Sequence, residues 1–168
     1  MDEYEISLGK EDMKFSSAHF TLFEHAVERL HGHNYRVSLT LRARALRRGL
    51  LLDFGVVKQE ARRLCAELDE ALLVPAACDE VAIVERDGEI ELRCRGKRYV
   101  LPASDCRLLP VSNASCECLA EYFCRTLLGR LQAELSAAGV VALAITVEES
   151  PGQSGRCLLT LDHAGGDS

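Results

Sequence analysis

Four of the five histidines in the chain lie within residues 19–33, and three of them, His19, His31 and His33, could bind one metal ion. His19 ends the segment KFSSAH, and His31 and His33 are separated by a single glycine in LHGHNY. If LHGHNY is extended, His31 and His33 point to the same face, because side chains alternate along a strand. Three imidazoles with an open fourth position are the usual ligands of a catalytic zinc ion. From the spacing alone, ordinary packing of histidines on a strand stays a second interpretation.

The sequence around these histidines predicts that strands hold them. Residues 14–20 favour an extended segment, and residues 31–43 alternate between an apolar and a polar face. A loop over 21–29 joins the two segments. If the two strands pair, His19 lies close to the other two imidazoles, which strengthens the metal interpretation but leaves the packing role open.

The rest of the chain predicts an α+β domain. The order is strand pair, helix, hairpin insert, helix and strand pair, which predicts one domain over 1–168 with an antiparallel sheet and helices on one face. Asn113 or Ser115 could cap the second helix, and residues 164–168 are expected to form a frayed tail. The later elements are expected in this order: a turn and short strand over 47–55, a helix over 56–72, a hairpin insert over about 80–106, a helix over 113–139, and strands over 140–150 and 155–163.

Composition excludes several classes of partner. The formal net charge of −6 argues against nucleic acid, which needs a basic face. No run of about 18 apolar residues predicts a membrane span, and the acidic first residues do not resemble a signal peptide. The eight cysteines are irregularly spaced, which predicts free thiols in a reducing compartment. We therefore expect a cytoplasmic protein.

Six short motifs occur in a distinctive order along the chain: FSSAH, HGHNY, LLLDFGVVK, LDEALLVP, NASCECLAEYF and VEESP. Together they resemble the 6-pyruvoyl-tetrahydropterin synthase family, which includes the 6-carboxytetrahydropterin synthases of queuosine biosynthesis. The resemblance implies a β-β-α-α-β-β tunnelling fold. It implies three subunits that close their sheets into a barrel, two trimers that stack into a hexamer, and active sites between subunits.

The resemblance also implies a cofactor and a substrate. It implies Zn²⁺ bound by His19, His31 and His33, and 7,8-dihydroneopterin triphosphate as the small-molecule partner. The carboxylate that anchors the pterin matches Glu149 in VEESP, with Glu148 as the alternative. The remaining residues that the resemblance assigns to substrate or that could bind the triphosphate are Ser115 and Glu117 near the pterin, and the nearby cations Lys14, Arg29 and Arg36.

The chain departs from the family where proton transfer is expected. The usual member has a cysteine between the first histidine and HGH, but this chain has Glu24 and Glu28 there and no cysteine. In LDEALLVP, Asp69 is kept and Glu70 replaces the usual histidine. We take Glu28, three residues before His31, as the general base in preference to Glu24.

A glutamate in this loop resembles the type III members of the family. These cleave the C1′–C2′ bond of the substrate and release 6-hydroxymethyl-7,8-dihydropterin for folate biosynthesis. We therefore expect a zinc-dependent lyase with this reaction. One alternative is a 6-carboxy- or 6-pyruvoyl-tetrahydropterin synthase that uses Glu28 or a cysteine from elsewhere, Cys116 or Cys118. Another is a zinc- and pterin-binding homologue that is inactive or recruited to a different pathway.

Overall fold

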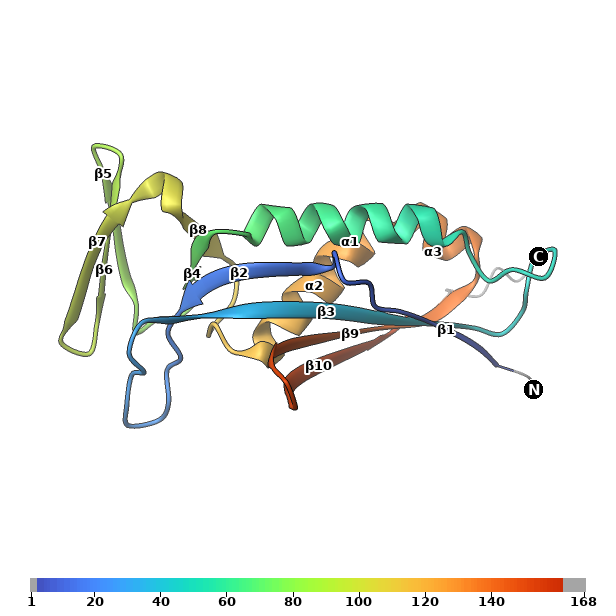
Figure 1. Ribbon diagram of the computed structural model, residues 1–168, viewed down its shortest axis with the longest axis horizontal. Helices are drawn as coiled ribbons and strands as arrows, with labels where there is room; N and C mark the ends of the chain where they lie inside the picture. Colours follow the sequence, from blue (N-terminus) through green and yellow to red (C-terminus); the bar gives the residue numbers. More distant parts are fainter. Residues whose placement is uncertain (1–2, 162–168) are drawn as a thin grey trace.

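The computed structural model describes residues 3–161, so the tail expected over 164–168 lies outside the described residues. A twisted sheet carries the α-helices of the described residues on one face, and a smaller sheet stands at one end (Figure 1). This confirms the α+β class and the helices on one face. Within the described residues, the α-helices are α1 (Phe54–Leu68), α2 (Cys116–Arg130) and α3 (Gln132–Ala137), and a 3-10 helix, η1 (Ala103–Asp105), precedes β8.

The large sheet has seven strands, in the order β10-β9-β3-β2-β4-β8, with β1 paired to the far half of β3. Its strands are β1 (Tyr4–Leu8), β2 (Lys14–His19), β3 (His31–Ala43), β4 (Ala71–Pro75), β8 (Cys106–Leu109), β9 (Val140–Ser150) and β10 (Gln153–Thr160). The expected all-antiparallel sheet is wrong, because β4 runs parallel to both β2 and β8. The chain between β2 and β4 passes through β3 and α1, and the chain between β4 and β8 passes through the insert, so both parallel pairs have the long connection that parallel strands require.

Strand β4 was not predicted from the sequence pattern. The elements expected over 47–55 and 113–139 also differ from the prediction. Every residue of β4 is buried, so the strand shows a continuous apolar run without alternation. The strand expected over 47–55 is absent, apart from a bridge between Arg47 and Leu50. The helix expected over 113–139 is interrupted at Leu131, which separates α2 from α3.

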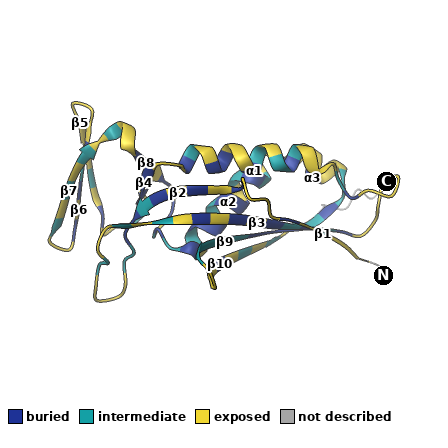
Figure 2. Ribbon diagram, viewed as in Figure 1, coloured by how far each residue is buried: buried dark blue, intermediate teal, exposed yellow. Residues whose placement is uncertain are grey.

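Strand β3 forms the floor of the main core. Tyr35, Val37 and Leu39 are at most 2% exposed and face the helices, whereas the residues between them face outward. Leu64 of α1 and Phe123 of α2 pack onto this face. Figure 2 shows buried residues along the middle of β3 and on the helix faces turned toward the sheet. The alternation over 31–43 therefore predicted the correct buried face.

The insert is a separate three-stranded antiparallel sheet with its own core. Its strands are β5 (Ala82–Arg86), β6 (Glu89–Cys94) and β7 (Lys97–Pro102). The Asp87–Gly88 turn joins β5 to β6 as expected, but a third strand follows. Ile90 and Leu92 pack with Phe20 in a second hydrophobic cluster. The insert therefore packs against the chain next to the end of β2.

No helix in the described part of the chain is long and apolar enough to cross a membrane.

Candidate active site

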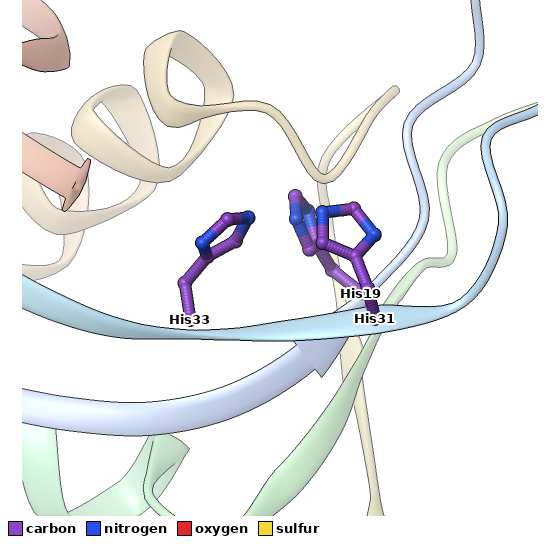
Figure 3. Close-up of side chains that lie close together, drawn as sticks. All are labelled: His19, His31 and His33. Atoms are coloured by element: carbon purple, nitrogen blue, oxygen red, sulfur yellow. The ribbon is translucent and has the colours of Figure 1, made fainter.

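The three histidines lie together at the end of the large sheet nearest the insert. Their ring centroids are 4.6 Å (His19–His31), 5.2 Å (His19–His33) and 4.7 Å (His31–His33) apart. Each offers one ring nitrogen, and these three nitrogens lie within 4.8 Å of one another. Figure 3 shows the rings rising from the same side of the paired strands toward a common space.

Strand register brings the three rings together. In the antiparallel pair of β2 and β3, His19 is opposite His31, and Ser17 is opposite His33. Directly opposed residues in such a pair point to the same face, and so do residues two apart on one strand. All three imidazoles therefore lie on the side of the sheet that carries the helices.

The hydrogen bonds of two histidines leave nitrogens suited to a metal. The Nδ1 of His19 donates to the carbonyl of Ala114 at 2.7 Å, and its buried Nε2 has no partner in the described chain. The Nδ1 of His31 donates to the carbonyl of Arg29 at 2.8 Å. A backbone acceptor on one ring nitrogen is the usual partner of a metal-binding histidine, because it fixes the tautomer and the orientation of the ring.

Electrostatics at His19 favour the neutral form that a metal requires. Burial lowers the pKa of His19 below its usual value, and the electrostatic effect of the nearby His31 and His33 acts in the same direction. The bond to the carbonyl of Ala114 acts in the opposite direction but is the smaller effect. A neutral imidazole with an unpartnered Nε2 fits a divalent ion, so the residues present are consistent with the zinc site of the resembling family.

A cavity of about 560 Å³ opens over the histidines. This volume lies within the range of small-molecule sites. None of the residues that line it, all within the described chain, is a lysine or an arginine. The lining residues come from the 21–28 loop, the start of α2 and the β9–β10 turn as well as the strands, and they are His19, Thr21, Phe23, Glu28, His31, His33, Ser115, Cys116, Glu117, Glu149, Gly152, Gln153 and Ser154.

The two glutamates of the loop occupy different positions. Glu28 lines the cavity, and its Oε1 lies 3.9 Å from the Nε2 of His31. Glu24 is at the tip of the loop with its side chain 87% exposed, close to His25 and outside the lining of the cavity. The geometry thus brings Glu28, and not Glu24, to the histidines.

Glu149 enters the cavity from the end of β9. The Sγ of Cys116 donates to its Oε2 at 3.4 Å. Burial, and after it the neighbouring Glu149 carboxylate, raises the pKa of the Cys116 thiol to about 12, so Cys116 is a protonated donor near neutral pH. Glu148 lies in register with Arg36 and lines a different recess, so of the two glutamates only Glu149 faces the histidines.

The first turn of α2 supplies another wall of the cavity. Ser115 is the N-cap, and its hydroxyl accepts from the amide of Cys118 at 3.3 Å. Ser115 and Glu117 both line the cavity, so the cap and a position near the substrate are compatible roles. The helix approaches β10 closely at Gly155, where a Cβ would lie 2.4 Å from the amide nitrogen of Glu117.

Several expected residues lie outside this cavity. Asp69 accepts from the amide of Ser16 at 2.7 Å, and Glu70 lines a separate recess beside β2. Lys14 and Arg36 oppose each other in the register of β2 and β3, on the exposed face of those strands. A role for Asp69 or Glu70 in catalysis would require a cavity shared with another subunit, which stays a prediction.

The sequence reasoning missed residues that shape the site through the backbone. Asn113, expected as a helix cap, instead binds the loop: its Oδ1 accepts from the amide of Leu22 at 3.1 Å and its Nδ2 donates to the Leu22 carbonyl at 2.8 Å. Phe23, 56% exposed, is the one aromatic side chain besides the histidines in the lining. The available signal for Phe23 was an aromatic residue in the predicted loop that precedes HGH.

Comparison with known proteins agrees with this site. Residues 8–157 match the model of the family described as 6-pyruvoyl tetrahydropterin synthase. The chain belongs to this family. A relative from Methanocaldococcus jannaschii, provisionally named a 6-carboxy-5,6,7,8-tetrahydropterin synthase, is 31% identical over 146 residues, which cover 86% of this chain and 88% of the relative. A similarly named protein from Pyrococcus abyssi is 26% identical over 154 residues, with 90% of each chain covered.

Solved structures of the family agree with the fold. The 6-pyruvoyltetrahydropterin synthase of Plasmodium vivax superposes with a TM-score of 0.90 at 29% identity, covering 96% of this chain and all of that chain. The Plasmodium falciparum protein gives the same TM-score at 28% identity and the same coverage. Family membership makes the protein a lyase of the 6-pyruvoyl tetrahydropterin synthase family, and the cluster of His19, His31 and His33 is consistent with the zinc site of that family.

Proposed function

We propose that the protein is a zinc-dependent lyase that acts on the C6 side chain of 7,8-dihydroneopterin triphosphate, with Glu28 as the general base. The observation that carries the proposal is the convergence of the three histidines, Glu28 and Glu149 on one cavity. Each group has a separate role, since the imidazoles hold the metal, Glu28 takes a proton, and Glu149 binds the pterin.

Glu149 suits the pterin end of the substrate. The 2-amino group and N3 of a pterin present two parallel N–H donors, which match the two oxygens of one carboxylate. Cys116 donates a hydrogen bond to Oε2 of Glu149, which orients that carboxylate before the substrate arrives. Ser115 and Glu117 stand beside it at the start of α2 and can bind the remaining polar edge of the ring.

The histidines suit the side-chain end of the substrate. His19, His31 and His33 would hold zinc, which when bound supplies a Lewis acid that acidifies a hydroxyl of the substrate side chain. The acceptors of His19 and His31, the carbonyls of Ala114 and Arg29, keep both Nε2 atoms directed into the cavity. Glu28 lies beside this position and can accept the proton that the hydroxyl releases.

A related enzyme supports a glutamate in this role. One of the Plasmodium vivax 6-pyruvoyltetrahydropterin synthase structures is a variant in which a glutamate, described as a catalytic residue, is replaced by alanine. In this chain, the loop between His19 and HGH contains no cysteine, and Glu28 is its one carboxylate in the lining of the cavity. Carbon–carbon cleavage needs a base that takes the proton of the 2′-hydroxyl and an acid that then gives a proton to C1′. One carboxylate beside the metal can do both in turn, because it carries the proton that it has just accepted.

Two candidate products are consistent with this proposed function. The glutamate in place of cysteine favours C1′–C2′ cleavage to 6-hydroxymethyl-7,8-dihydropterin. The names of the relatives favour a 6-carboxy- or 6-pyruvoyl-tetrahydropterin product, and the comparisons support this second candidate more strongly. Cys116 is the one cysteine in the cavity lining, but its raised pKa makes it a poor base, so Glu28 serves both candidates.

The oligomer is part of the proposal. The main sheet is open, with β10 and β8 at its edges, and Leu158 of β10 is 55% exposed. Exposed edge strands are usually covered or paired. A trimer that joins these edges into a barrel, stacked as a hexamer, would pair them and could bring Asp69 and Glu70 to the cavity of a neighbouring subunit.

Replacement of Glu28 tests the assignment of the base. Glu28→Gln keeps the size and polarity of the side chain but removes its basicity, so we expect kcat to fall by about 10²-fold or more. Zinc content should be unchanged, because Glu28 is not a proposed ligand. Glu24→Gln in the same loop is the comparison. Loss of turnover in Glu24→Gln with full turnover in Glu28→Gln would transfer the role to Glu24. A wild-type protein that binds zinc and pterin without turnover would indicate a recruited or inactive homologue.

A further inference from the structure

The loop that carries Glu28 is a short hairpin between β2 and β3. Leu22 and Val27 form an antiparallel bridge. The amide of Phe23 donates to the carbonyl of Ala26 at 2.8 Å, and the amide of Glu28 donates to the carbonyl of Thr21 at 2.9 Å. These bonds close the loop on itself, but they do not fix its position relative to the histidines.

Two cations from the insert bind the backbone of this loop. The Nη1 of Arg95 donates to the carbonyls of Phe23, at 2.6 Å, and Ala26, at 3.3 Å. The Nζ of Lys97 donates to the carbonyls of Val27, at 3.0 Å, and Glu28, at 2.6 Å. Figure 1 shows the loop and the small sheet at the same end of the molecule. Four loop carbonyls thus accept from two side chains that belong to a separate sheet.

The insert holds Arg95 in a defined position. The Nη2 of Arg95 donates to Oε1 of Glu80 at 2.8 Å, and its Nε donates to Oε2 of the same carboxylate. Arg95 and Gly96 form the two-residue turn between β6 and β7, with φ of +43° and +82°. A positive φ is unfavourable for an arginine and occurs where the surroundings enforce it. This backbone and the Glu80 pair aim the guanidinium at the loop.

The position of Glu28 depends on this support. Its side chain is 37% exposed and has one ion-pair neighbour, His31 at 3.9 Å, so the loop backbone determines where the carboxylate lies. Lys97 binds the carbonyl of Glu28, and the next carbonyl, of Arg29, accepts from the Nδ1 of His31. The same short segment therefore sets both the carboxylate and the orientation of one histidine.

We propose that Arg95 and Lys97 are positioning residues that hold the 21–28 loop against the insert and so keep Glu28 beside the three histidines. Neither residue is in the lining of the cavity, and both act through the loop carbonyls. The insert thereby has a function in the reaction, an inference that rests on the role of Glu28 given above. A displacement of about 1 Å in a catalytic group can lower turnover by about 10²-fold, so a loosened loop should affect kcat.

The test compares variants of the full-length, zinc-loaded protein. Lys97→Met and Arg95→Leu remove the donors and keep apolar bulk. Arg98→Leu is the control, because Arg98 lies on the same strand as Lys97 but binds Glu91 and makes no hydrogen bond to the loop. We expect kcat for 7,8-dihydroneopterin triphosphate to fall by about 10- to 100-fold in the first two variants, with KM and zinc content near wild type. Lys97→Arg should recover part of kcat.

Hydrogen exchange tests the same contacts without activity. The amides of Leu22, Phe23 and Glu28 are hydrogen-bonded, and they should exchange faster in Lys97→Met and Arg95→Leu than in wild type or Arg98→Leu. Unchanged exchange of these amides, or kcat equal to that of Arg98→Leu, would overturn the proposal. If wild type turns over no pterin, the proposed function fails, and hydrogen exchange alone then tests whether Arg95 and Lys97 hold the loop. If Lys97→Met does not fold, Arg95→Leu and Glu80→Gln supply the comparison.

Discussion

Gly155 of β10 permits a close approach between its strand and the first turn of α2. A Cβ at this position would lie 2.4 Å from the amide nitrogen of Glu117 and 2.5 Å from the carbonyl carbon of Cys116. Ordinary contacts of a Cβ begin at 3.4 Å, so Gly155→Ala requires the first turn of α2 to withdraw by about 1 Å. Because both neighbours are backbone atoms, no side-chain rotation can relieve the overlap.

Gly155→Ala should lower both the stability and the activity of the protein. Overpacking of this kind costs about 1–3 kcal/mol of unfolding free energy. The displaced turn carries Ser115, Glu117 and the thiol that binds Glu149, so we also expect kcat/KM to fall by about 10²-fold. Urea denaturation measures the first effect, and steady-state kinetics on 7,8-dihydroneopterin triphosphate measures the second.

Gly129, on the helix that Gly155 contacts, provides the control. A Cβ there would meet no atom within 4 Å. Gly129→Ala should therefore raise the unfolding free energy by about 0.5–1 kcal/mol, because alanine favours a helix, and should leave kcat/KM unchanged. A Gly155→Ala protein with the stability and activity of wild type would refute the close packing of α2 on β10.

Three further predictions concern the histidines and Cys116. His31→Ala should lose zinc and turnover together, measured by metal analysis and kinetics; retained stoichiometric zinc would contradict the three-histidine site. In the metal-free protein, burial lowers the pKa of His19, so as the pH falls below about 6.5 the unfolded chain takes up a proton that the folded chain resists. The unfolding free energy should therefore fall as the pH is lowered from about 7.5 to 5.5, and it should fall less in His19→Gln. If urea denaturation gives the same pH dependence of the unfolding free energy for both proteins, this prediction is contradicted. The Cys116 thiol, with its pKa of about 12, should be alkylated near pH 8 far more slowly than Cys118, as followed by mass spectrometry of the native protein; equal rates would contradict its burial.

Strand β3, which holds two of the histidines, was predictable, whereas β4, on the other side of β2 in the sheet, was not. Residues 31–43 alternate because one face packs on helices and the other faces outward, and this period appears in any sequence with that environment. Strand β4 is buried along its whole length, so its ALLVP segment carries no period and could not be distinguished from a buried turn of helix. The parallel pairing followed from that strand and was missed with it.

Some residues of the candidate site were predictable from the sequence, and others were not. His31 and His33 could be assigned to one face from spacing alone, since a strand has period two. The contacts of Arg95, Lys97 and Gly155 could not be predicted, because each joins elements far apart in the sequence and depends on where a second sheet or a helix lies. Sequence pattern predicts which face a residue occupies, and tertiary packing decides what that face meets.

The central claim is that the zinc-loaded protein cleaves the side chain of a pterin with Glu28 as base. The most direct measurement is to incubate wild type and Glu28→Gln with 7,8-dihydroneopterin triphosphate and identify the pterins by chromatography and mass spectrometry. We predict that wild type consumes the substrate, that Glu28→Gln is at least about 10²-fold slower, and that 6-hydroxymethyl-7,8-dihydropterin is released. A 6-pyruvoyl product, which keeps all three side-chain carbons, would retain the lyase and reject C1′–C2′ cleavage. A 6-carboxy product, which keeps only C1′, would retain that cleavage and reject the hydroxymethyl product. Undiminished turnover in Glu28→Gln, or no turnover by zinc-loaded wild type, would contradict the claim.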